Sequence, residues 1–88
     1  MIIDIAKFGD ILISRPAGRE AALIIMSSFR PANDFEPIEL DFSKVKVVTS
    51  PWLNEVLTSL RDTYGERGRC LRSTNSTLIE SLKFVSSR

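Results

Sequence analysis

The sequence predicts an α/β domain with about four strands in one mixed sheet and three helices, in the order β-β-α-β-α-β-α. Short β-branched runs alternate along the chain with segments whose apolar residues recur at helical spacing. The chain has 88 residues, which is enough for one hydrophobic core, so residues 1–88 are predicted to form a single domain. Apolar residues make up 43% and charged residues 26%, as in ordinary globular proteins.

The first third of the chain predicts two strands and a helix. Ile2 to Ile5 and Ile11 to Ser14 are β-branched runs separated by a Gly9-Asp10 turn, so they are expected to pair as a hairpin. Apolar residues then recur at helical spacing from Pro16 to Phe29. Pro31 ends this helix, because a residue that precedes proline disfavours the helical backbone.

The middle of the chain predicts a half-buried strand and the clearest helix. Residues Ile38 to Phe42 alternate between apolar and polar, and a second short run, Val45 to Val48, follows. The next helix begins at Ser50-Pro51. Its apolar stripe consists of Leu53, Val56, Leu57, Leu60 and Tyr64.

The last third predicts a short strand, Arg69 to Arg72, and a third helix that begins near Asn75 to Thr77. Thr77 and Glu80 have the spacing of a capping box. This helix is expected to bury Leu78, Leu82 and Val85.

Charge and cysteine content indicate a cytoplasmic location and argue against two classes of partner. The net charge is +1, so neither nucleic acid nor a membrane surface is an expected partner. No apolar run approaches the roughly 18 residues that a membrane span needs. The start of the chain does not resemble a signal peptide. The lone Cys70 indicates a reducing compartment, where we expect it to be a small apolar residue without special reactivity.

The chain contains no histidine. This absence excludes histidine-assisted nucleophiles, imidazole acid–base catalysis and histidine-bearing metal sites. We therefore expect no catalytic residues, no cofactor and no metal. A small enzyme that uses Ser50, Lys7 or Lys44 without histidine is the last of the alternatives.

The segment from Leu40 to Leu57 resembles the central signature of STAS domains, the superfamily of anti-sigma-factor antagonists. In that signature an "LDFS-x-V" strand leads through a serine-bearing loop into a helix. Ser50-Pro51-Trp52-Leu53-Asn54-Glu55 is similar to the "S-S-F-L-x-E" of the uncharacterised STAS-like branch. Phe8 to Arg15 resembles the "F-G-x-x-L/I-x-S-R" found near the N-terminus of that branch.

The resemblance implies a phosphorylation-controlled docking loop. Studied members bind a kinase-type anti-sigma factor, and phosphorylation of a loop serine abolishes this binding. Ser50 matches that serine, and Thr49 takes the place of the acidic residue before it. Pro51-Trp52 replaces a small Ser-Gly pair. The resemblance also places partner contacts on the outer face of the following helix, at Asn54, Glu55, Thr58 and Arg61.

Structural roles are the alternatives for the same residues. Ser50 lies where a helix N-cap is expected, so its hydroxyl could serve only the first turn. Trp52 stands one position before the apolar stripe, so it is either core or contact anchor.

The leading hypothesis is a non-catalytic interaction domain whose partner is a kinase-like ATPase or another regulator. The alternative is a structural subunit or homodimer without a switch.

Overall fold

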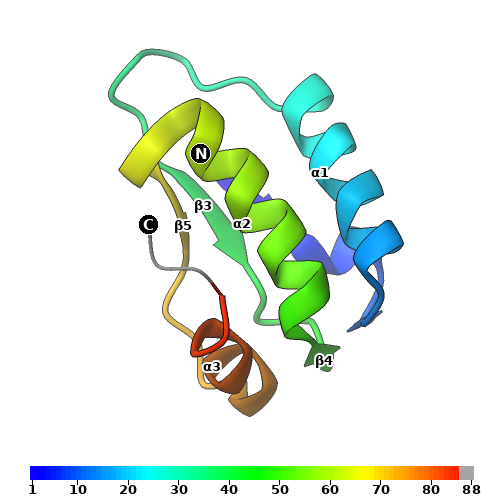
Figure 1. Cartoon of the computed structure of the whole chain (residues 1–88). Helices are drawn as coiled ribbons and strands as arrows, with labels where there is room; N and C mark the ends of the chain where they lie inside the picture. Colours follow the sequence, from blue (N-terminus) through cyan, green and yellow to red (C-terminus); the bar gives the residue numbers. More distant parts are fainter. Residues whose placement is uncertain (86–88) are drawn as a thin grey trace.

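The computed structural model describes residues 1–85 and forms a layer of strands covered by helices on one face (Figure 1). The strands are β1 (Ile2–Asp4), β2 (Ile11–Leu12), β3 (Ile38–Asp41), β4 (Val47–Val48) and β5 (Gly68–Cys70). The α-helices are α1 (Arg15–Ser28), α2 (Ser50–Tyr64) and α3 (Ser76–Leu82). Two single-turn 3-10 helices complete the order, η1 (Ile5–Phe8) and η2 (Gly65–Arg67).

The strands form two sheets in which every pair is parallel. The first sheet has the order β1-β3-β5, and the second consists of β2 and β4. The α/β class and the three α-helices are confirmed. The prediction of one mixed sheet of about four strands was wrong, since the described residues form five strands in two parallel sheets.

The predicted hairpin between the first two strands was also wrong. Between them η1 carries the chain forward, with Asp4 as its N-cap and Gly9 at φ 125° as its end. β1 pairs with β3 at an offset of 37 residues (Ile2 with Glu39), and β2 pairs with β4 at an offset of 36. Residues 2–4 and 11–12 therefore pair in the same order with residues 39–41 and 47–48. Between the two pairings lie η1 in one segment and the turn after β3 in the other.

Helices α1 and α2 lie side by side over the strands (Figure 1). They approach most closely at Gly18, where a Cβ would lie 2.6 Å from the backbone oxygen of Trp52. Only glycine allows two helix backbones to come this near. The core beneath them includes four residues of the predicted stripe in α2, namely Leu53, Val56, Leu57 and Leu60.

Helix α3 packs against β4 at the end of the molecule (Figure 1). Its N-cap is Asn75, which accepts from the N–H groups of Thr77 and Leu78, so the predicted Thr77–Glu80 capping box was wrong. The Thr77 hydroxyl accepts from the Val48 N–H at 3.1 Å, and the Ser81 hydroxyl donates to the Val48 carbonyl at 2.9 Å. The side chains of Thr77 and Ser81 thus provide hydrogen-bond partners for the backbone N–H and carbonyl of Val48 in β4.

Candidate functional site

Ser50 is the first residue of α2, and Thr49 is the N-cap. The Thr49 hydroxyl does not cap the helix; it donates to the carbonyl of Ile13 at 2.5 Å and so ties the helix start to the end of β2. Ser50 is half-buried, and within residues 1–85 its hydroxyl makes no hydrogen bond. The interpretation of Ser50 as a capping residue was therefore wrong, and its hydroxyl is available to a partner or to an enzyme.

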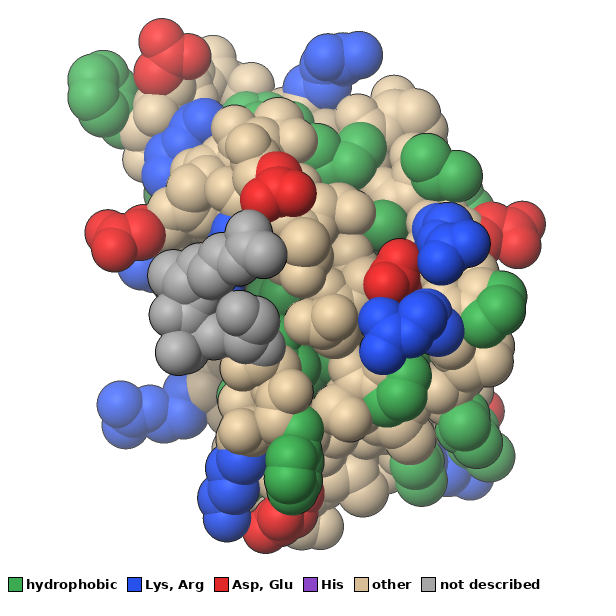
Figure 2. All heavy atoms as spheres, in the orientation of Figure 1, with side chains coloured by type: hydrophobic (Ala, Val, Ile, Leu, Met, Phe, Trp, Pro, Cys, Tyr) green, Lys and Arg blue, Asp and Glu red, His purple; other side chains and the backbone are tan. Residues whose placement is uncertain are grey.

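The Ser50 side chain lines a shallow groove of about 410 Å³ between the start of α2 and α3. We call it the docking groove. Its wall on the α3 side includes Glu80 and Phe84, and the Phe84 side chain is 75% exposed. Figure 2 shows hydrophobic side chains on the surface over α3. Ile79 and Leu82 are also exposed but do not line the groove, so the prediction that Leu82 is buried was wrong.

Trp52 does not belong to this surface. Its side chain is 1% exposed and packs edge-on against Phe42, with the ring centroids 6.2 Å apart. The prediction that Trp52 contacts a partner was therefore wrong, and the alternative interpretation as a core residue is correct.

Glu55 is occupied by an interhelical ion pair. Arg15 reaches from α1 to its carboxylate at 2.8 Å, and Arg19 lies at 3.4 Å. The hydrogen bond from the Arg15 guanidinium, with a weaker one from Arg19, holds the pKa of Glu55 below its ordinary value. Glu55 thus joins the two helices, and a partner could use its carboxylate only in competition with Arg15.

Asn54 and Thr58 lie one turn apart on α2 and are both half-buried. The Thr58 hydroxyl donates to the Asn54 side-chain oxygen at 3.5 Å, a long hydrogen bond that leaves polar atoms of both residues available. Neither residue lines the docking groove. Their predicted contact with a partner stays a prediction.

A family model described as "STAS-like domain of unknown function (DUF4325)" matches residues 27–87. The matched residues make up more than half of the chain. The chain belongs to this family of STAS-like domains. The match extends from the last turn of α1 through α3, and it includes Ser50 and the whole docking groove.

The signature from Leu40 to Leu57 lies inside the matched part of the STAS-like domain, whereas the motif from Phe8 to Arg15 precedes it. No curated protein and no solved structure gave a significant match to the chain. The family assignment therefore depends on the family model alone.

Within residues 1–85 of the STAS-like domain, no helix is long and apolar enough to cross a membrane. Over the same residues, His, Cys, Asp and Glu side chains nowhere gather in a group that could hold a metal ion.

Cys70 is expected to react slowly with thiol reagents in the folded STAS-like domain. Burial raises the pKa of its thiol to about 11 from an ordinary value of 9.0. At pH 8 the reactive thiolate fraction should therefore be roughly 100-fold lower than in the unfolded chain. The rate of reaction with a chromogenic disulfide, measured with and without denaturant, checks this. Equal rates in both states would contradict the burial argument.

The α3 wall of the groove could not be predicted from the sequence. Glu80 and Phe84 were not predicted as site residues, because each lies some thirty positions from Ser50. Leu78, Ile79 and Leu82 form one apolar face of this helix, whereas Glu80 lies on the other side, so the apolar pattern does not point to the groove.

Proposed function

We propose that this STAS-like domain is a non-catalytic regulatory module that binds a protein partner through the docking groove. The observation that carries the proposal is the position of Ser50. Ser50, whose hydroxyl makes no hydrogen bond within residues 1–85, lines a shallow surface groove together with the exposed Phe84. Exposed aromatic residues are typical anchors of protein interfaces. A shallow groove suits such a contact better than it suits enclosure of a small substrate.

Phosphorylation of Ser50 is the proposed means of control. A phosphoryl group carries about −1.5 to −2 charges at neutral pH and lies well at the N-terminal end of a helix. In this groove it would share the space with the carboxylate of Glu80. The domain would remain folded, while the mainly apolar contact surface around Phe84 would gain a strongly hydrated charge. A partner that requires an uncharged surface would then be repelled.

The proposed partner is a kinase-like ATPase of the anti-sigma-factor type or a related regulator. This class follows from the resemblance of the loop and helix around Ser50 to STAS domains that bind such kinases. The exposed Phe84, which lines the docking groove, supports an apolar contact with that partner.

Replacement of Ser50 by glutamate tests the proposal. The variant should keep its thermal unfolding temperature within a few degrees, because an acidic residue is favourable in the first turn of a helix. Its affinity for the partner isolated with the wild-type domain should fall by at least about tenfold, since the added charge is desolvated at the contact. Calorimetric titration of the purified pair measures the difference.

The matched control is Ala17→Glu, which adds the same charge to an exposed position in the first turn of α1. This variant should bind the partner with wild-type affinity. An unchanged affinity of the Ser50→Glu variant, or equal losses in both variants, would remove the docking groove from the interface.

A further inference from the structure

A second cleft, of about 680 Å³, lies at a different place from the docking groove. Its walls are two loops. One follows β3 and contributes Ser43, Val45 and Lys46; the other follows β5 and contributes residues 72–76. Because β3 and β5 are parallel neighbours, both loops leave the sheet at its carboxyl edge. Ligands of open α/β sheets bind in crevices outside this edge.

The lining of this cleft has the chemistry of an anion site. Among residues 1–85, the charged residues that line it are the cations Lys46 and Arg72, and no carboxylate does so. The remaining polar lining consists of Ser43, Ser73, Thr74, Asn75 and Ser76. Hydroxyl, amide, ammonium and guanidinium groups together supply many hydrogen-bond donors. Such a set is suited to the oxygens of a phosphate group.

Of the two cations that line the cleft, Arg72 is the better candidate to bind an anion. Within the described residues its guanidinium makes no ion pair or hydrogen bond. Lys46 pairs with Asp10 at 3.6 Å, but both side chains are more than half exposed. An exposed pair of this kind is worth at most about 1 kcal/mol, so an incoming anion can replace Asp10 as the partner of Lys46.

The cleft walls are positioned by specific hydrogen bonds. The Asn75 amide donates to the Val45 carbonyl at 2.7 Å and so joins the two loops. The Asp41 carboxylate accepts from the Ser43 N–H at 2.9 Å, which fixes the turn after β3. A loop pair held in this way loses less conformational freedom when a ligand binds.

We propose that this cleft binds a small phosphate-bearing anion, with Arg72 and Lys46 as the charged contacts and the loop hydroxyls as donors. Of the described residues that line the cleft, only Val45 is apolar and none is aromatic. The cleft therefore offers no apolar or aromatic surface against which a nucleobase could stack, and recognition is directed at the phosphate groups. This proposal does not depend on the proposed docking function.

Nuclear magnetic resonance titration of the full chain with pyrophosphate tests the proposal. Saturable amide shifts are expected at residues 43–46 and 72–76. Two phosphate groups can engage both cations, so pyrophosphate should bind at least about threefold more tightly than inorganic phosphate. ATP should bind within about threefold of tripolyphosphate, since the base gains no contact.

Two variants and a control locate the site. Arg72→Gln and Lys46→Gln should each weaken pyrophosphate binding, Arg72→Gln by about tenfold because it removes a charge-assisted contact. Arg69→Gln is the matched control, because Arg69 is an exposed cation of β5 that pairs with Glu39 and does not line the cleft. Its affinity should change by less than about twofold.

Three results would overturn the proposal. They are shifts that grow linearly without saturation, equal losses in Arg72→Gln and Arg69→Gln, or shifts that map away from the two loops. A much tighter binding of ATP than of tripolyphosphate would refute the part of the proposal that excludes a base.

Discussion

Replacement of Trp52 by alanine is expected to lower the free energy of unfolding by about 3–5 kcal/mol. The indole is 1% exposed and packs against Phe42, beneath the crossing of α1 and α2. Small domains have total stabilities near the lower end of about 5–15 kcal/mol. Loss of this side chain should therefore leave a large fraction of the chain unfolded at room temperature.

Urea denaturation followed by far-ultraviolet circular dichroism measures the effect. Fluorescence is unsuitable, because Trp52 is the only tryptophan of the chain. The matched control is Phe35→Ala, since the Phe35 ring is 87% exposed. The control should change the stability by no more than about 0.5 kcal/mol. A loss below about 1 kcal/mol in Trp52→Ala would show that the indole is not buried in the core.

Replacement of Gly18 by alanine is expected to cost about 2–3 kcal/mol. Two effects oppose each other here. Alanine favours a helix over glycine by at most about 1 kcal/mol. However, its Cβ would lie 2.6 Å from the oxygen and 2.8 Å from the Cα of Trp52, and both are backbone atoms of α2. They can move away only if the two helices separate, so the steric cost is expected to exceed the gain.

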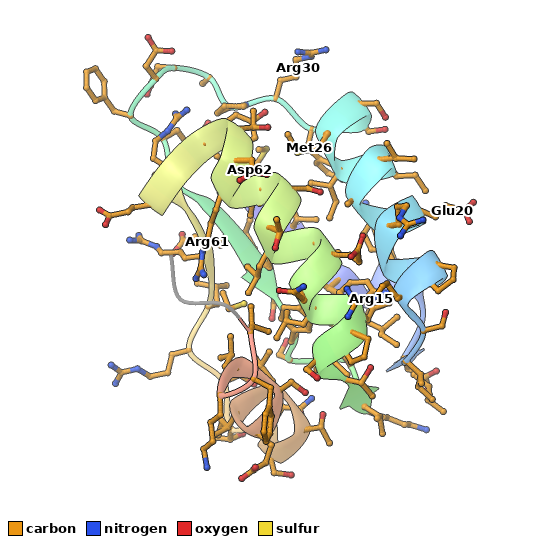
Figure 3. All side chains as sticks on the ribbon, in the orientation of Figure 1. Arg15, Glu20, Met26, Arg30, Arg61 and Asp62 are labelled. Carbon is orange, nitrogen blue, oxygen red and sulfur yellow. The ribbon has the colours of Figure 1, made fainter. Side chains whose placement is uncertain are left out.

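Thermal unfolding of Gly18→Ala and of Glu20→Ala separates these effects. Glu20 is exposed on the outer face of α1 and points away from α2 (Figure 3), so Glu20→Ala should leave the stability nearly unchanged. Gly18→Ala should lower the unfolding temperature by roughly 8–20 °C for a domain of this size. A Gly18→Ala variant more stable than wild type would contradict the close helix crossing.

The helices could be predicted from sequence because each has a local pattern. The stripe from Leu53 to Leu60 follows helical periodicity, and the proline near the start of α2 is a local signal of a helix start. Both are found in the structure. The pairing of β1 and β2 could not be predicted in the same way. Gly9 reads as a hairpin turn, whereas it ends η1, and the true partners of both strands lie more than thirty positions away.

The candidate site was predictable only in part, for the same reason. Ser50 could be placed at a helix start from its own neighbourhood. The N-cap residue is Thr49, however, and its hydroxyl donates to Ile13 of a distant segment instead of capping the helix. Trp52 has no local signal that decides between core and surface. The α3 wall of the groove, with Glu80 and Phe84, depends on how α3 packs against β4.

The parallel pairing has a consequence for the order in which the chain can assemble. Among the five strands of residues 1–85, no two that are adjacent in sequence pair with each other, so no local hairpin can nucleate either sheet. During synthesis, β1 and β2 remain unpaired apolar segments until their partners β3 and β4 have left the ribosome. Until then α1 is the longest element that can form without distant partners, and premature termination after it would release an aggregation-prone fragment.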